Sequence, residues 1–151
     1  MIDNIDRQIV SLLQADARLS NATLAERVGL TTSTVHARVK KLERKGIIKG
    51  YVAVVDAETL GKPILAFIGL TVGSASTDYL ESKNSVLSIC QDEPDVLECH
   101  TVAGEDCYIM KVRAASPGDL ERLIERIRCN AKVSRTTTSI VLSTLKERAQ
   151  V

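Results

Sequence analysis

The sequence predicts an α+β protein in which three helices form a first domain and a four-stranded sheet with two helices forms a second. Two observations support this fold class. Apolar residues recur at helical spacing through the first fifty residues, and after residue 63 strand-like and helix-like segments follow one another in the order βαββαβ. A turn-rich stretch separates the two patterns. We therefore expect domains at residues 1–50 and 63–151, joined by a hinge at 51–62.

The first helix is expected to begin at Asp3, because Asp6 follows three positions later, in the spacing of a helix N-terminus. Ser20 can cap a second helix that runs to Val28, and Gly29 can supply the left-handed residue that ends it. The first helix is expected to pack through one apolar stripe, because its apolar residues recur at helical spacing. They are Ile5, Ile9, Leu12 and Leu13.

A third helix follows, capped by Thr31 or Thr32 and closed by Gly46, with Val35, Val39 and Leu42 on its inner side. Within residues 21–40, the fifth, ninth and fifteenth places hold a small residue, a glycine and a branched apolar residue, which are Ala25, Gly29 and Val35. These residues suit two helices that cross closely, turn sharply and share a core, which is the arrangement of a helix-turn-helix motif. An ordinary three-helix bundle can show the same spacing by chance.

The outer face of the third helix carries no acidic residue, whereas a merely solvated face usually alternates the two charge signs. Short hydroxyl side chains near a helix N-terminus can reach base edges in the major groove, and cations farther along suit phosphates. We therefore expect this face to bind double-stranded DNA, and in a dimer to recognise imperfect palindromes. The alternative is a solvated surface. The face comprises Ser33, Thr34, Ala37, Lys40, Lys41 and Arg44, with His36 on its flank.

The charge distribution agrees with this assignment. Residues 1–50 hold nine Lys/Arg and five Asp/Glu, a net +4, while residues 51–151 hold eleven and fourteen, a net −3. The first domain is therefore the candidate for a polyanionic partner, and the second has some other task.

Several other classes of protein are not expected. No apolar run approaches the ~18 residues of a membrane helix, and the start MIDNIDRQIV lacks a signal peptide's pattern, so we expect a cytoplasmic protein without a membrane partner. The four cysteines contain no C-x-x-C pair, so no zinc, disulfide scaffold or cofactor is expected. A metal or nucleophile site at Cys99, His100 and Cys107 is disfavoured, because free cysteine is usually a small buried hydrophobe.

The second domain is expected to form one antiparallel sheet with both helices on the same face. The other face would then pair with a second subunit, giving a homodimer. The predicted helix after Ser116 and Pro117 faces inward through Leu120, Leu123, Ile124 and Ile127. The expected strands are residues 64–72, 96–102, 107–114 and 133–145, and the first helix of this domain is expected at 78–90.

The chain resembles the Lrp/AsnC (leucine-responsive, feast/famine) family of prokaryotic transcription regulators over nearly its whole length. The stretches that carry the resemblance are IDRQIVSLLQADARLS, LAERVGL, TVHARVKKLERKGIIKGY, ECHTVAGEDCY and TTTSIVLSTLK. The resemblance implies a DNA-binding first domain and an amino-acid-sensing second domain with a ferredoxin-like fold. It also implies dimers that assemble into tetramers or octamers, with the effector held between dimers near a glycine loop.

Carried over by position, the resemblance places that loop at Gly104, Glu105, Asp106, Cys107 and Tyr108. The opposite wall of the effector site would include Thr136 and Thr138, whose spacing puts them on one strand face. Cys107 stands where the family pattern has an aspartate that would pair with an effector's ammonium group. Glu105 or Asp106 is available instead, although in an extended strand Asp106 would point to the opposite face. Alternatively, the loop is only a tight turn.

The sequence therefore favours a transcription regulator whose DNA binding or assembly responds to an amino acid or a related small molecule. A nucleoid-organising protein without an effector is the alternative, and the two differ in their response to ligand. An enzyme that uses Cys107 or His100 is disfavoured, because no base, orienting acid or phosphate loop stands at a recognisable spacing.

Overall fold

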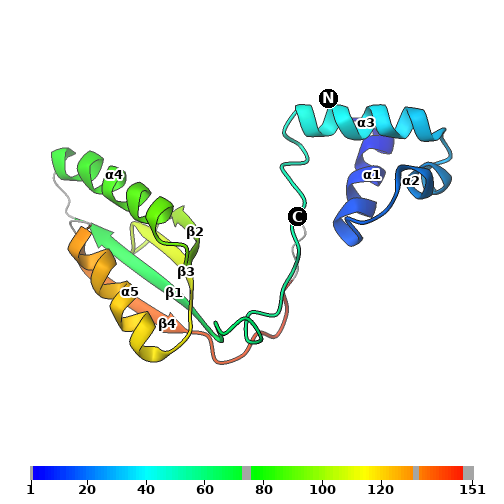
Figure 1. Cartoon of the computed structure of the whole chain (residues 1–151). Helices are drawn as coiled ribbons and strands as arrows, with labels where there is room; N and C mark the ends of the chain where they lie inside the picture. The colour runs from blue at the N-terminus through cyan, green and yellow to red at the C-terminus, as the bar shows by residue number, and fades with distance from the viewer. Residues whose placement is uncertain (1, 73–75, 131–132, 148–151) are drawn as a thin grey trace. The chain divides into compact units, whose positions relative to one another are not determined.

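The computed structural model describes residues 2–72, 76–130 and 133–147 (Figure 1). These residues fall into two compact units, one containing residues 2–54 and the other Val55–Leu145. Each unit has its own hydrophobic core. Within the described ranges, no helix combines the length and apolar character that crossing a membrane requires.

Local capping sequences define the three helices of the first unit, α1 (Asn4–Ala15), α2 (Asn21–Val28) and α3 (Thr32–Arg44). Asp3 and Asp6 form a reciprocal capping box at α1, while Ser20 and Thr31 cap α2 and α3. Gly29 ends α2 with φ of 70°, a conformation that favours glycine. The predicted helix boundaries and caps are confirmed. The common core consists of Ile9, Leu13, Leu24, Ala25, Val35, Val39 and Leu42.

An ion pair between α1 and α3 accompanies this apolar core. Asp6 is only 1% exposed, and its Oδ1 lies 2.7 Å from Nη1 of Arg38. The same nitrogen lies 2.6 Å from Oδ2 of Asp3. Since a buried carboxylate is costly without a partner, the pair favours one orientation of α3 against α1.

Residues 45–63, all of which are described, contain no helix or paired strand. Val52 and Val54 are 79% and 85% exposed. The β-leaning composition after Gly46 therefore does not produce a strand within the single chain, because a strand needs a neighbour for its backbone groups. A turn at 57–61 ends with Gly61 at φ of 75°.

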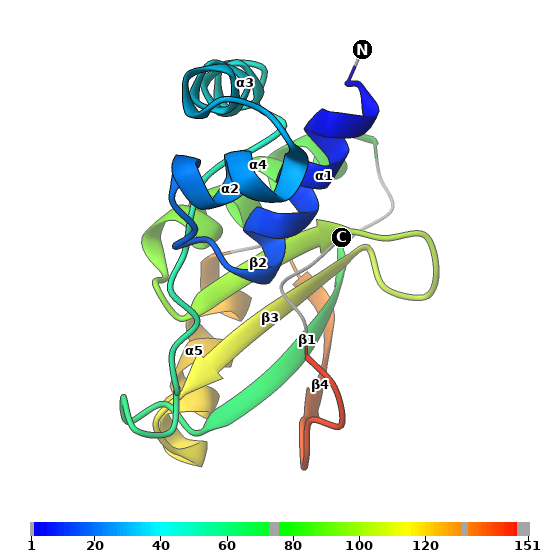
Figure 2. The ribbon, with the colours of Figure 1, turned by 90° about the vertical axis from the view of Figure 1, so that its right-hand side faces the viewer.

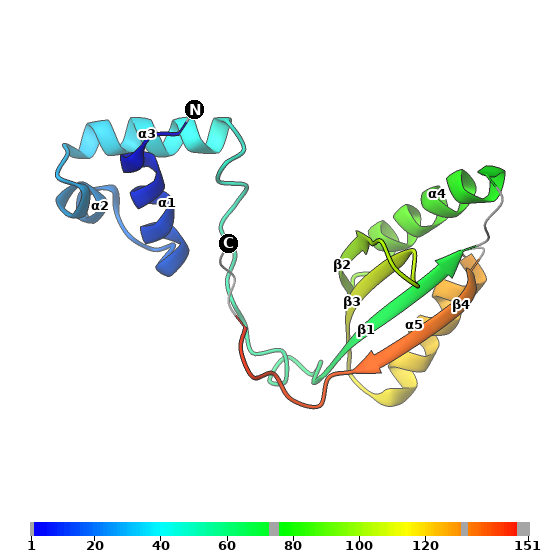
Figure 3. The ribbon, with the colours of Figure 1, turned by 180° about the vertical axis from the view of Figure 1, so that it is seen from behind.

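The second unit has the predicted βαββαβ order: β1 (Ile64–Val72), α4 (Ser76–Asp92), β2 (Val96–Thr101), β3 (Tyr108–Ala114), α5 (Pro117–Asn130) and β4 (Val133–Ile140). All strand pairs are antiparallel, and the order across the sheet is β2-β3-β1-β4 (Figure 3). This is the expected ferredoxin-like topology.

The prediction that the last strand extends to residue 145 is wrong. Ile140 pairs with Ala66, and the amide of Val141 donates the last bond to the carbonyl of Leu65. Beyond this point β4 would run past the start of β1, where Pro63 has no N–H to offer a ladder. The other differences are small: α4 extends the predicted 78–90 helix by two residues at each end, β2 ends one residue early, and β3 begins one residue late.

Both helices lie on one face of the sheet (Figure 2). The core beneath them combines alternate residues of β1 and β3 with apolar residues of α4 and α5. Of the predicted inward residues of α5, Leu120, Leu123 and Ile127 are buried, and Ile124 is half-buried. The opposite face has no helix among the described residues, and Phe67 on it remains 40% exposed.

The ion pair between α1 and α3 gives the first testable prediction. Replacing Arg38 with alanine leaves Asp6 buried without its cation, so the first unit should unfold about 10 °C lower. Arg44→Ala is the matched control, because Arg44 is exposed on the same helix and makes no ion pair within the described residues. Thermal unfolding followed by circular dichroism measures both. Equal midpoints for the two variants would show that the ion pair does not position α3.

Candidate DNA-binding surface and ligand site

The outer face of α3 is open to solvent. Its N-terminal half presents hydroxyl side chains and its C-terminal half presents cations, in the order that the sequence predicts. Arg38 also lies on α3, but it is held by Asp3 and Asp6 and is therefore not available to a ligand. The exposed residues are Ser33, Thr34, His36, Ala37, Lys40, Lys41 and Arg44.

The hydroxyls at the start of α3 form a small cluster around the capping residue. Oγ1 of Thr31 accepts a bond from the backbone amide of Thr34 and lies 2.8 Å from that residue's Oγ1. It also lies 3.1 Å from Oγ of Ser33. Since a hydroxyl can rotate to donate or accept, the cluster offers adaptable hydrogen-bonding groups at one end of the helix.

His36 connects α3 to α2. Nδ2 of Asn21 lies 3.1 Å from Nδ1 of the imidazole, and because an amide nitrogen can only donate, Nδ1 accepts this bond. His36 therefore lies at the edge of the candidate surface, as predicted, and also holds the two helices of the motif together.

The cations of this face differ in their surroundings. Nζ of Lys40 lies 3.0 Å from Oε2 of Glu43, while Lys41 and Arg44 make no ion pair within the part of the chain that the structure describes. Hydrogen bonds from Lys40 and, more weakly, from the Tyr51 hydroxyl hold the pKa of Glu43 below its usual value. Sequence reasoning missed this contact, although the i,i+3 spacing of Lys40 and Glu43 is a signal for it.

The predicted effector loop connects β2 to β3. Gly104 and Glu105 are exposed, while Asp106 and Cys107 are half-buried. A bend brings the Asp106 carboxylate over Gly69 of β1, where an added Cβ would lie 2.3 Å from its Oδ2. Only a residue without a side chain leaves room for the carboxylate in this position.

Two side chains, Thr71 and Arg135, lie beside the Asp106 carboxylate, and both also contact Glu105. The Thr71 hydroxyl donates 3.4 Å bonds to Oδ1 of Asp106 and to the Glu105 carbonyl. Nη2 of Arg135 lies 3.8 Å from both Oδ1 of Asp106 and Oε2 of Glu105. These distances are too long for tight ion pairs, so the guanidinium and the carboxylates keep hydrogen-bonding capacity for a ligand beside them.

Thr136 and Thr138 do not join this group. They pair with Leu70 and Ile68, which belong to the core beneath the helices, and directly paired residues share a face. Gly69 lies between those two core residues, so the Asp106 carboxylate stands on the opposite, helix-free face. The predicted wall of two threonines therefore does not face the loop carboxylate, whereas Arg135 does.

Three of the four cysteines pack against the core of the second unit, and Cys129 is exposed. Cys107 is half-buried and packs against the core of the second unit. Burial, together with a hydrogen bond that the Cys99 thiol donates to Cys90, raises the pKa of Cys99 to about 12, so the thiol stays protonated at neutral pH. Among the described residues, no three His, Cys, Asp or Glu side chains gather in a way that could hold a metal ion.

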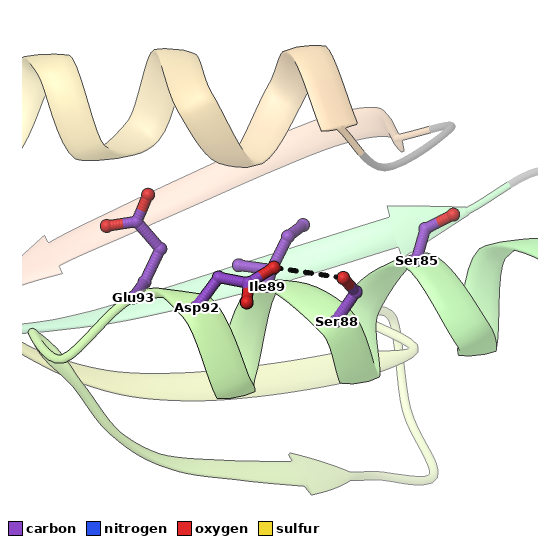
Figure 4. A pocket seen from close by; sticks show the side chains of 5 residues that line it. All are labelled: Ser85, Ser88, Ile89, Asp92 and Glu93. Carbon is purple, nitrogen blue, oxygen red and sulfur yellow. Dashed lines mark hydrogen bonds between the residues drawn. The ribbon is translucent and has the colours of Figure 1, made fainter.

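A separate shallow cavity of about 240 Å³ lies along α4 (Figure 4). Ser88 donates to Asp92, and Glu93 is held by Arg126 of α5 at 2.6 Å. None of the predicted site residues lines this cavity, and its polar side chains already have partners, since Ser85 also donates to the Glu81 carbonyl. The remaining lining residues are Ser85 and Ile89.

Comparison with known proteins gives the same two-part division. Residues 2–49 match the winged helix-turn-helix DNA-binding family, and residues 65–151 match the Lrp/AsnC ligand binding domain. An HTH-type transcriptional regulator, LrpA, from Mycobacterium tuberculosis is 38% identical over 143 residues, covering 95% of this chain and 91% of that protein.

Two solved structures are similar over the full length of the chain. A feast or famine regulatory protein from M. tuberculosis, complexed with L-methionine, has a TM-score of 0.89 at 36% identity and covers 100% of this chain and 99% of its own. A transcriptional regulator from Neisseria meningitidis, also complexed with L-methionine, has a TM-score of 0.89 at 26% identity, with coverages of 100% and 96%.

Proposed function

Because the chain belongs to the Lrp/AsnC family of transcription regulators, we propose that it reads specific double-stranded DNA sequences through the outer face of α3. The observation that carries this proposal is the exposed arrangement of hydroxyls followed by cations on that face. The hydroxyl cluster at Ser33 and Thr34 can reach base edges, and Lys40, Lys41 and Arg44 can contact phosphates. The protein is then a regulator and not an enzyme, and works in the cytoplasm in association with the nucleoid.

We propose that an amino acid binds at the loop between β2 and β3. Two similar regulators are complexed with L-methionine, and an amino acid carries the two charges that this loop can complement. The Asp106 carboxylate suits its ammonium group, and the Arg135 guanidinium suits its carboxylate. Glu105, Thr71 and backbone groups near Gly104 complete the site. Of the other predicted effector residues, Cys107 packs against the core, and Thr136 and Thr138 lie on the other face of the sheet, so none of the three is assigned a contact with the ligand.

The helix-free face of the sheet supports the proposal that the protein is a homodimer, which assembles further into a tetramer or octamer. Phe67 and Leu97 are 40% and 52% exposed in the single chain, and exposed apolar surface on a sheet favours association. Asp106 and Arg135 lie at this face, so a neighbouring subunit could complete the effector site and couple ligand binding to assembly.

The DNA proposal predicts the salt dependence of binding. If about three cations per subunit meet phosphates, a dimer's affinity should fall with a log-log salt slope of about −5. Replacing both Lys40 and Lys41 with alanine should weaken binding to all sequences alike and flatten this slope. Ser33→Ala or Thr34→Ala should instead relax the preference for particular bases. Binding isotherms at several salt concentrations measure this, and an unchanged slope in the double lysine variant would contradict it.

The assembly proposal predicts that a fragment beginning at Lys62 still dimerises, because the interface lies in the sheet domain. Analytical ultracentrifugation at micromolar concentration measures its mass, with the intact chain as the reference. A stable, folded monomeric fragment would show that the helix-free face is not the dimer interface.

The effector proposal predicts that Asp106→Asn weakens amino-acid binding by about 1 to 3 kcal/mol, because the ammonium group loses a charged acceptor. Glu105→Gln is the matched control and should have a smaller effect, since its side chain is 92% exposed. Calorimetric titration with L-methionine and the other standard amino acids measures both variants. Equal affinity in Asp106→Asn and the unchanged protein would contradict the proposed role of this carboxylate.

The companion variant Cys107→Asp tests the position where the family pattern has its aspartate. Because Cys107 packs against the core, we expect a carboxylate there to lower the thermal stability without tightening binding. Tighter binding by Cys107→Asp would instead show that residue 107 faces the effector and that the assignment to Asp106 is wrong.

A further inference from the structure

We propose that Tyr51 and Glu43 form a relay that restrains Lys40, and thereby link the segment leaving the helical domain to the strength of DNA binding. This inference rests on the proposed function, because it acts through a lysine of the DNA-binding face. Tyr51 is the first residue of the proposed hinge, residues 51–62. A change in this segment could therefore reach α3 directly.

The relay begins with the ion pair on α3. The Lys40 side chain is 59% exposed, yet its ammonium group lies 3.0 Å from one carboxylate oxygen of Glu43. A phosphate must compete with this carboxylate for the same ammonium group. Exposed pairs of this kind are weak, so a small change at Glu43 can shift the balance between the two partners of Lys40.

Tyr51 holds the other oxygen of the same carboxylate. Its hydroxyl donates a 3.1 Å hydrogen bond to Oε1 of Glu43, while Lys40 occupies Oε2. Partial burial, together with the neighbouring carboxylate, raises the pKa of Tyr51, so the hydroxyl keeps its proton at neutral pH. The tyrosine therefore fixes the Glu43 rotamer that faces Lys40.

The surroundings of Tyr51 allow it to move. The residue lines a cavity of about 240 Å³ whose apolar walls include Leu13, Leu24 and Val39, and Glu43 and Lys40 line the same cavity. Tyr51 itself is 48% exposed. Because the side chain is partly exposed and adjoins this cavity, it can shift without a steric clash. Displacement of residue 51 would free Glu43 and, through it, Lys40.

The substitution Tyr51→Phe tests the relay without changing the net charge. Loss of the hydroxyl should release Lys40, so the intact protein should bind DNA about two- to tenfold tighter, with a salt slope steeper by up to about one per subunit. The probe is a fluorescently labelled duplex that carries a site selected from random-sequence DNA. Fluorescence anisotropy at several salt concentrations gives both quantities, and a thermal melt confirms that the variant is folded.

Two backgrounds show whether the effect passes through Lys40. In Lys40→Ala, Tyr51→Phe should have no effect on affinity or slope, whereas in the matched control Lys41→Ala it should keep its full effect. The relay is overturned if Tyr51→Phe as a single substitution changes neither the DNA affinity nor the salt slope. It is also overturned if the substitution changes them equally in all three backgrounds. If Lys40→Ala weakens DNA binding but Tyr51→Phe is silent, only the relay fails. If Lys40→Ala leaves affinity unchanged, the proposed phosphate contact fails, and the relay with it.

Discussion

The ion pair between Asp6 and Arg38 is the constraint on which the DNA-binding surface depends. An apolar core specifies the orientation of its helices less strictly than a buried charge does, because apolar contacts are non-directional. A buried carboxylate permits far fewer arrangements, because it must meet its cation. With Val35, Val39 and Leu42 in the core and Arg38 directed toward α1, the helical period leaves Ser33, Ala37, Lys41 and Arg44 exposed on α3.

Acidic residues perform different tasks along this chain. Asp3 and Asp6 start a helix and fix another against it, so they contribute to structure although they lie in the basic domain. Glu43 lies beside the candidate DNA-binding face and occupies one of its cations. Asp106 stands on the helix-free face of the sheet opposite a guanidinium, in a place that Gly69 leaves open. Net charge alone distinguishes none of these roles.

The sequence predicts those features that local rules control. The caps at Asp3, Ser20 and Thr31 and the turn at Gly29 depend on residues within four positions of one another, and the structure confirms each of them. The order of elements in the second domain follows from periodicity in the same way. The end of β4 cannot be predicted in this way. It depends on the pairing with β1, which is preceded by Pro63, a residue without an N–H, more than seventy residues earlier in the chain.

In the candidate sites, too, some features follow from local sequence and others depend on contacts between distant parts of the chain. The outer face of α3 follows from helical geometry, whereas the contact of Tyr51 with Glu43 depends on how the chain turns after Gly46. At the loop, alternation along an extended strand predicts that Asp106 and a residue at position 107 point to opposite faces. The bend at this loop decides which of them reaches Gly69, and no local pattern encodes that bend. Arg135 was missed because its relevance appears only once β4 lies beside β1.

We propose that two copies of α3 read a defined DNA sequence. Selection of the intact protein against a pool of random-sequence duplexes, followed by sequencing of the bound fraction, tests it most directly. We expect enrichment of an imperfect palindrome whose half-sites lie about one helical turn apart, or a multiple of it. Retention of DNA without any enriched sequence would contradict it and would indicate a protein that organises DNA without reading it.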